Sequence, residues 1–344
     1  MHYCGLDVSA KSTHVYIEDE EGRRVRRTIV TTTPEGIRGA LARYQDGRLT
    51  VALEAGNQTA WIHDELRELG CKVHIVHPLK VKWIAESKKK TDRVDAQLLA
   101  HLLRIGGLPE PVHMPSRRSR ELRALLGARR QLVQMRTKLM NVARGLLHQQ
   151  RVQIRAKGLR TEQGWRELKN LPLSAAVREV VDAYAATVAA TTAALKALDG
   201  ELTRRAGVDA RVARLQTIPG VGQVSAQTLV ASVDRIERFA NAKKLVAYSG
   251  LVPSVRASGD RVVYGRITKQ GRSEIRAVWV QAAHAALAVK DGRARPLQRW
   301  CERVAHRRGK KTALVALARK LLTIAFHLLR DRTTYDPGHL RCAA

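Results

Sequence analysis

Two aspartates three residues apart, Asp92 and Asp95, have the spacing in this chain that is best suited to chemistry. They follow a lysine run at residues 88–90. If Thr91 caps a helix that continues through residues 96–100, positions i and i+3 lie on one face of it. Both carboxylates then point to the same place, which is how a helix holds a hard metal ion.

Two further acids each end an apolar run. Asp7 closes residues 1–7, and Glu54 closes residues 49–54. A buried strand that ends in an acid places this acid at the carboxyl edge of a sheet, where α/β folds bind their ligands. Four carboxylates are therefore predicted to converge as catalytic and metal-binding residues: Asp7, Glu54, Asp92 and Asp95.

Such a cluster suits Mg²⁺, which prefers oxygen ligands and keeps several of its waters. Two ions about 4 Å apart activate an attacking oxygen and stabilise a leaving one, which is the general scheme for cutting or joining phosphodiesters. In the competing interpretation, Asp92 only caps a helix and Asp95 is a solvated residue on it. The strand-terminal positions of Asp7 and Glu54 favour the metal site.

The charge of the chain is unevenly distributed. Its 344 residues carry a formal net charge of +31. Residues 1–110 contain 17 Lys and Arg against 15 Asp and Glu, whereas residues 111–344 contain 45 against 16. A nearly neutral head is thus joined to a very basic remainder. Basic segments of this size typically neutralise nucleic-acid phosphates, and a basic membrane-facing surface is the alternative for charge alone.

Targeting signals and cysteines point to the compartment. No apolar run reaches the roughly 18 residues of a membrane span, and no signal-peptide pattern is present. The four cysteines are scattered, without C-x-x-C spacing: Cys4, Cys71, Cys301 and Cys342. We expect a reduced, cytoplasmic protein with no structural zinc site and no membrane partner.

The first hundred residues alternate between strand and helix patterns. Three strands come in succession, and the next helix is capped by Thr33, has Pro34 in its first turn and runs to about Tyr44. This order favours a mixed sheet with helices on its faces and suits an RNase H-like core. The predicted strands are residues 3–8, 14–17, 24–30, 49–54 and 72–76, and a second helix covers residues 58–69.

Beyond a proline-rich linker at residues 109–115, two heptad seams predict a pair of long helices. The first seam has Leu125, Leu132, Leu139 and Leu146, with Ala128, Met135 and Val142 three residues further on. The second has Val177, Val181, Tyr184, Val188, Thr191, Leu195, Leu198 and Leu202. The two helices, joined by a less regular segment at residues 158–172, can pair within one chain or between protomers, and both alternatives stay open.

The run Ile-Pro-Gly-Val-Gly at residues 218–222 lies between two predicted helices, the second over residues 225–233. It is typical of a helix-hairpin-helix element, in which Gly220 and Gly222 let backbone N–H groups approach a phosphate. In the competing interpretation these glycines only make a tight turn.

A polar loop further on carries Ser258 among cations. A serine hydroxyl attacks phosphorus only when a base or nearby cations activate it, and on the residues alone Ser249 and Ser254 compete for this role. The neighbouring cations are Arg256, Arg261, Lys269 and Arg272, of which Arg256, Lys269 and Arg272 are our candidates for nucleic-acid binding. A last helix, from Lys310 to about Leu329, is expected to pack the domain together.

In this order the motifs resemble those of the DEDD transposases of the insertion-sequence-110 family, which are related to the Piv DNA invertases. The resemblance runs from residue 3 to about residue 330. It rests on Gly5-Leu6-Asp7-Val8-Ser9, Glu54-Ala55, Thr91-Asp92-Arg93-Val94-Asp95-Ala96, the Ile-Pro-Gly-Val-Gly turn, Gly250-Leu251-Val252-Pro253, Ser258-Gly259 and Lys269-Gln270-Gly271.

The resemblance implies three parts: a RuvC-like, RNase H-like DEDD catalytic domain (residues 1–110), a basic helical coiled coil (111–208) and a mainly helical transposase domain with the helix-hairpin-helix (209–335). It implies a composite active site, in which metal-bound acids act with Ser258, and Ser258 becomes covalently linked to DNA. The implied partners are element and target DNA, a non-coding guide called the bridge RNA, and further copies of the chain as a dimer or tetramer. The implied location is the prokaryotic cytoplasm, at the nucleoid when DNA is bound.

Three other classes remain open from the residues. A plain RuvC-like endonuclease, such as a junction resolvase, needs the four acids but not Ser258. A non-catalytic helix-hairpin-helix protein that binds nucleic acid needs neither. A sugar-kinase-like ATPase shares the strand start at residues 5–7, but the head has no later glycine-rich phosphate loop.

Overall fold

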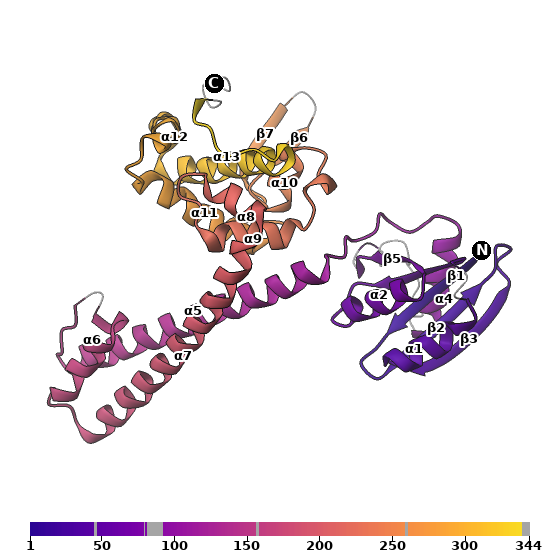
Figure 1. The fold of residues 1–344 in the computed structure, drawn as a ribbon, viewed down its shortest axis with the longest axis horizontal. Coiled ribbons are helices and arrows are strands. Elements are labelled where there is room, and N and C mark those ends of the chain that lie inside the picture. The colour runs from indigo at the N-terminus through magenta and orange to yellow at the C-terminus, as the bar shows by residue number, and fades with distance from the viewer. Residues whose placement is uncertain (45–46, 79, 81–91, 156–157, 259–260, 339–344) are drawn as a thin grey trace. The chain divides into compact units, whose positions relative to one another are not determined.

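The computed structural model describes residues 1–44, 47–78, 80, 92–155, 158–258 and 261–338 (Figure 1). The chain forms two compact units, Met1–Met114 and Pro115–Ala344. The first contains an α/β sheet and the second is mostly helical. This division agrees with the predicted combination of an α/β head and an all-α remainder.

The head is built on one mixed sheet of five strands in the order β3-β2-β1-β4-β5. β1 pairs antiparallel with β2, which pairs antiparallel with β3, whereas β1 and β4, and β4 and β5, are parallel. The strands are β1 (His2–Val8), β2 (Ser12–Glu18), β3 (Arg24–Thr31), β4 (Leu49–Glu54) and β5 (Lys72–Val76). The predicted strands and mixed sheet are confirmed, and the arrangement is consistent with an RNase H-like domain.

Helices cover both faces of this sheet. α1 (Pro34–Leu41) and α2 (Thr59–Glu68) share one hydrophobic core with alternate residues of β1 and β4, among them Leu6 and Val51. α4 (Asp92–Arg104) packs on the other face through Ala96, Leu99 and Ala100. Thr33 caps α1 as predicted, but the α-helix ends at Leu41, and residues 42–44 form a 3₁₀ turn.

The second unit begins with two helices of 33 residues, α5 (Arg117–Gln149) and α7 (Ala175–Gly207). They pair within the chain as an antiparallel hairpin (Figure 1), because the start of α5 packs with the end of α7 through Leu122 and Leu202, and its end packs near Val181 through Leu147. A short helix, α6 (Glu162–Glu167), lies between them in sequence. The predicted seam on α7 is confirmed, since Val181, Val188, Thr191, Leu195 and Leu202 are all buried.

The predicted seam on α5 is wrong in part. Met135 and Val142 are 50% and 44% exposed, and Ala128 is also exposed. The buried stripe lies one position away, at Leu122, Met140, Ala143 and Leu147. Arg129 lies in this stripe and donates a 2.5 Å hydrogen bond from Nε to Asp199 on α7. An ion pair between the helices thus takes a position for which hydrophobic periodicity expects an apolar residue.

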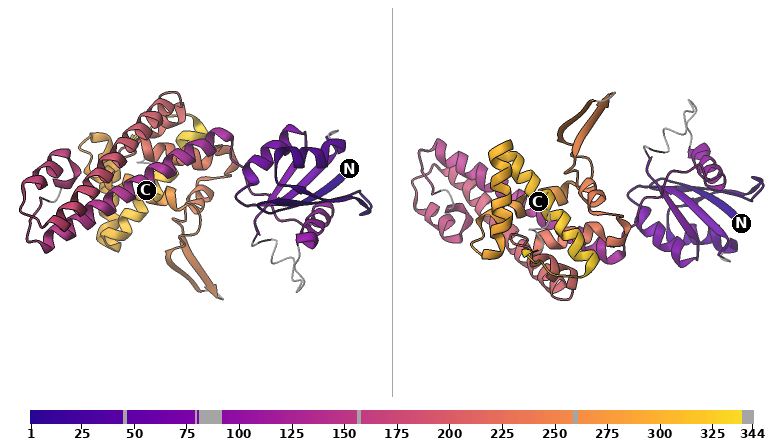
Figure 2. Two further views of the ribbon diagram at one scale, coloured as in Figure 1. Left: turned by 90° about the horizontal axis from the view of Figure 1, so that it is seen from below. Right: turned by 90° about the horizontal axis from the view of Figure 1, so that it is seen from above.

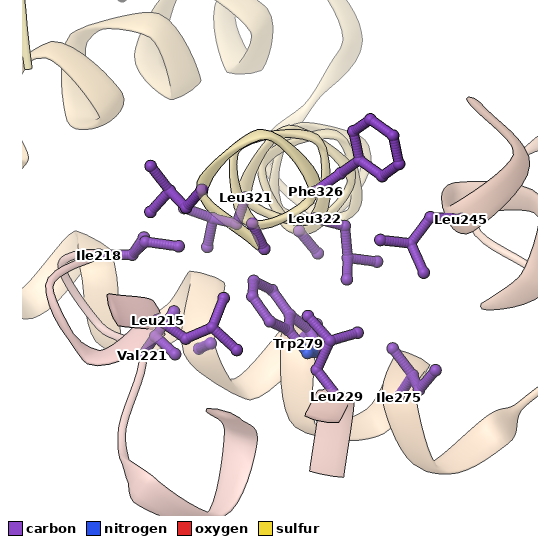
Figure 3. Packing of buried hydrophobic residues seen from close by; sticks show 14 of the residues in the cluster. Leu215, Ile218, Val221, Leu229, Leu245, Ile275, Trp279, Leu321, Leu322 and Phe326 are labelled. Carbon is purple, nitrogen blue, oxygen red and sulfur yellow. The ribbon is translucent and has the colours of Figure 1, made fainter. Parts of the chain in front are cut away.

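The rest of the second unit is a helical core with one projecting hairpin. Its helices are α8 (Ala210–Gln216), α9 (Gln223–Val233), α10 (Ala242–Tyr248), α11 (Ser273–Ala288), α12 (Arg295–Arg308) and α13 (Lys310–Asp331). The fully buried indole of Trp279 on α11 lies under Leu321 and Leu322 of α13, and Phe326 of α13 belongs to the same core (Figure 3). The predicted packing role of the last helix is confirmed.

One helix among the described residues, α13, has the length and composition that could cross a membrane. This corrects the expectation that no stretch is long and apolar enough. Half of its apolar window is buried inside the protein, however, where Leu317, Leu321 and Phe326 contribute to the core. Its apolar character is accounted for by this packing.

A buried carboxylate joins the start of α5 to the end of α9. Asp234, which follows α9 with a positive φ of +63°, accepts hydrogen bonds from the backbone N–H and hydroxyl of Ser116 and from the hydroxyl of Ser119. Charged acceptors make the stronger hydrogen bonds in proteins. The helical hairpin is thereby fixed to the C-terminal core.

Candidate active site

The register of the sheet brings Asp7 and Glu54 to neighbouring positions. β1 and β4 are parallel with Leu6 opposite Leu53, so the next residue of each strand is an acid. Side chains alternate along a strand, which places Asp7 on the face of Gly5 and Glu54 on the face of Ala52. The two predicted acids therefore share one face at the carboxyl ends of adjacent strands.

α4 packs on this same face, at a distance that only a glycine allows. A Cβ on Gly5 would lie 1.9 Å from the carbonyl oxygen of Ala96 and 2.8 Å from the backbone nitrogen of Ala100. The helix backbone thus rests directly on β1. Asp95 precedes Ala96, and it is half-buried there.

The direction of α4 sends its first turn toward the acids. At its last turn, Arg104 donates a 2.7 Å hydrogen bond from Nε to Glu18, which is almost fully buried. Glu18 pairs in register with Tyr3, near the amino end of β1. Since the end of the helix lies at the start of β1, its start, with Asp92 and Asp95, lies toward Asp7.

The described side chains do not yet form a closed metal site. In the part of the chain that the structure describes, no three Asp, Glu, His or Cys side chains lie close enough together to hold a metal ion. The side chain of Asp92 and the predicted cap Thr91 lie outside that part. Carboxylate oxygens on one face at one sheet edge nevertheless fit the donor chemistry of Mg²⁺.

Four residues around this arrangement were not identified from the sequence. Gly5 sets the approach of the helix, and Glu18 with Arg104 sets its direction. His14 is the cross-strand partner of Asp7 on β2. A glycine inside an apolar strand signals close approach of another backbone, but what approaches it is not visible in the sequence.

Ser258 ends the first strand of a hairpin, in a segment expected to be a loop. β6 (Pro253–Ser258) and β7 (Arg261–Ile267) pair antiparallel, and Ser258 is in register with Arg261. Figure 2 shows the hairpin projecting from the helices of its unit. Val255 is 55% exposed and Tyr264 is 70% exposed. The β-branched residues around Ser258 are the local signal for these strands.

The competing serine at position 249 is fully buried, and its hydroxyl donates a 2.6 Å hydrogen bond to the carbonyl of Val246. Arg256 and Lys269 are exposed on the hairpin and just beyond it. Arg272 is half-buried and donates from Nε to the Tyr248 hydroxyl at 3.2 Å. Burial alone would raise the pKa of Tyr248, but the hydrogen bond and charge of Arg272 outweigh burial and lower it.

The two glycines of the α8–α9 turn have different surroundings. Gly220 has φ +84°, and a Cβ there would lie 2.4 Å from the backbone nitrogen of Ala286 on α11. Packing of the turn against α11 therefore requires this glycine. Gly222 is exposed, and no atom lies within 4 Å of the position that a Cβ would take there, so of the two it is the one open to a ligand at the start of α9. Phosphate contact by either glycine stays a prediction.

Comparison with known proteins defines the class. Two transposase family models match the chain, one over residues 4–151 and the other, described as the IS116/IS110/IS902 transposase family, over residues 212–298. Together they span the carboxylate-bearing sheet, α5 and the serine hairpin. These regions define a transposase with a DEDD-type head.

Similar bacterial proteins support the same class. The chain is 29% identical to the transposase for insertion sequence element IS1111A of Coxiella burnetii, over 97% of this chain and 88% of the relative. It is 28% identical to a probable family 20 transposase of Pseudomonas aeruginosa (84% and 86%) and to the pilin gene-inverting protein of Moraxella bovis (77% and 74%). The chain belongs to the IS110 family of transposases.

The contact between Gly5 and α4 makes a direct prediction. Gly5→Ala should force α4 away from β1, destabilise the head by about 1–3 kcal/mol and lower the rate of DNA strand cleavage at least tenfold. Gly39→Ala is the matched control, because no atom lies within 4 Å of its Cβ position on α1. It should stabilise the head by about 0.5–1 kcal/mol.

Chemical denaturation and a strand-cleavage assay measure both effects. Wild-type stability and cleavage in the Gly5→Ala protein would show that the close approach does not position the acids.

Proposed function

We propose that this chain cuts and rejoins DNA strands to move an insertion sequence, with metal-bound acids and a serine nucleophile. The support that carries most weight is the packing of α4 across Gly5, which directs Asp95 toward the edge where Asp7 and Glu54 lie side by side. Membership of a transposase family supports the same reaction class.

In the proposed reaction, the Ser258 oxygen attacks a phosphorus of the DNA backbone. A new bond forms between Oγ and phosphorus, the bond from phosphorus to a deoxyribose oxygen breaks, and the serine proton leaves while the departing oxygen gains one. The number of phosphodiester bonds is unchanged. A hydroxyl of another strand can therefore reverse the step and reseal DNA without an external energy source.

The acids Asp7, Glu54, Asp92 and Asp95 would hold Mg²⁺, which stabilises charge on the attacking and leaving oxygens when it is bound. The shared face of Asp7 and Glu54 at the end of the parallel strands, with α4 packed over it, supports this proposal. Arg256 and Lys269 would hold the phosphates beside Ser258.

We further propose that a structured bridge RNA guides the protein and that several copies act together, as a dimer or tetramer in the prokaryotic cytoplasm. The cationic residues 111–344, with 45 Lys and Arg against 16 Asp and Glu, support binding of more than one nucleic-acid strand.

Single changes of the acids test the metal site. Asp7→Asn, Glu54→Gln, Asp92→Asn and Asp95→Asn should each reduce Mg²⁺-dependent cleavage by a factor of at least 100, while DNA affinity changes little because the basic unit supplies it. Cleavage kinetics and filter binding measure the two quantities. Asp64→Asn, at a partly buried position of α2, is the control. Normal cleavage by Asp92→Asn would remove that residue from the site.

The serine is tested by its covalent product. Ser258→Ala should lose both recombination and a DNA-linked protein band that survives denaturation, whereas Ser254→Ala should keep both. The band should also disappear in the four acid variants. Recombination at the normal rate by Ser258→Ala would favour the plain RuvC-like endonuclease, and an adduct mapped to Ser254 would reassign the nucleophile.

Guidance is tested by competition binding. Structured RNA transcribed from the end of the element should bind at least tenfold more tightly than a scrambled RNA of equal length, at the same salt concentration. Equal affinities would contradict guidance, while leaving the cleavage chemistry untouched.

A further inference from the structure

A cationic cavity lies within the second unit, between α5, α9 and α11. Its volume is about 330 Å³. Four arginines line it, with one glutamate among its lining residues: Arg123, Arg129, Arg130, Arg272 and Glu274. A phosphodiester group is small enough to enter a cavity of this size.

Two of the four arginines are paired with acids. Arg129 binds Asp199 across the helical hairpin, and Arg130 lies 3.9 Å from Glu274. Among the described residues, Arg123 and Arg272 have no such ion pair. The excess positive charge of the cavity therefore comes from these two side chains.

Both side chains are held in place by neutral partners. Arg123 donates from Nε to the carbonyl of Ala231 and from one Nη to that of Ser232, at 2.8 and 2.9 Å, and these bonds use two of its five N–H donors. Arg272 donates a hydrogen bond from Nε to the hydroxyl of Tyr248. Donors on each guanidinium remain available, and the geometry of each is fixed before any ligand arrives.

The positive charges of Arg123 and Arg272 repel each other. Burial lowers the pKa of Arg123 and the charge of Arg272 lowers it further, while Tyr248 and the carboxylate of Asp234 act in the opposite direction. An anion between them would relieve this repulsion. The planar fork of a guanidinium matches two oxygens of a phosphate, so phosphate is the anion that this pair suits best.

We propose that this cavity binds a backbone phosphate of the nucleic acid on which the protein acts. The proposal rests on the proposed function, which supplies the nucleic acid, and it adds Arg123 as a binding residue. Arg272 precedes α11 and follows β7 in the chain, so the strand held here would be held by the segment that also carries the serine hairpin.

The first test uses inorganic phosphate as the probe. Thermal melting of the full chain at constant ionic strength should show a higher Tm in phosphate than in chloride, since a ligand that binds only the folded state stabilises it. Arg123→Gln and Arg272→Gln should each lose this difference. Arg117→Gln, an 85% exposed arginine on the same helix, should keep it.

Two results would overturn the proposal: no phosphate-dependent rise in the wild-type Tm, or an equal rise in both cavity variants. If Arg123→Gln fails to fold because its two carbonyl bonds are lost, Arg272→Gln decides the outcome, since among the described residues its guanidinium donates only from Nε, to Tyr248.

The second test separates DNA from RNA as the source of the phosphate. The slope of log K against log salt should become less negative by about 0.9 for duplex DNA, or about 0.7 for a single strand, in each cavity variant but not in Arg117→Gln. A change seen only with DNA or only with structured RNA identifies the strand. Unchanged slopes with both would reject the cavity as a nucleic-acid contact.

The phosphate effect on Tm and the salt slope do not depend on DNA cleavage by the protein. The Ser258→Ala protein should keep the phosphate effect and the full salt slope, because it retains both arginines. Loss of the serine mechanism and loss of the cavity proposal are thus distinguished by different readouts.

Discussion

The close contact between β1 and α4 is the constraint on which the proposed active site depends. Gly5 has no Cβ, and Ala96 and Ala100 opposite it are small, so the backbone of the helix contacts β1 directly at this point. Aspartate side chains are short, and acids from a helix and a sheet can share an ion only if the two backbones are close. The buried pair of Glu18 and Arg104 fixes the other end of the helix, so that the approach cannot be lost by sliding.

The sequence predicted the head well because its signals are local. Strands that end in Asp7 and Glu54, the Thr33–Pro34 helix start and the alternation of apolar residues can each be recognised within a few residues. The position of α4 cannot, since Gly5 and Ala96 are distant in sequence and only strand pairing and helix packing bring them together. Asp92 and Asp95 were therefore recognised as a pair from their spacing, but nothing local showed which surface the helix would cover.

In the second unit, two features could not be predicted correctly from residue patterns: the buried face of α5 and the hairpin around Ser258. Hydrophobic periodicity found both long helices, but it assigned Met135 and Val142 to the interface because it excludes charged residues from a seam. Arg129 occupies the seam because Asp199 on the other helix pairs with it. In the same way, the segment around Ser258 was expected to be a loop from its polar residues, although Val255, Val262 and Val263 favour the strands that the structure contains.

The projecting hairpin also has an energetic consequence. A two-stranded ribbon is marginally stable in water when nothing covers it, and Val255, Val262 and Tyr264 leave apolar surface of this ribbon exposed. In the proposed mechanism, holding Ser258 in one reactive geometry would therefore cost conformational entropy that the ribbon alone does not offset. In that mechanism, contacts with the bound DNA would supply the difference. Under the proposed mechanism, a protomer without bound DNA would therefore cleave poorly, because the hairpin that carries Ser258 would be ordered only on the substrate.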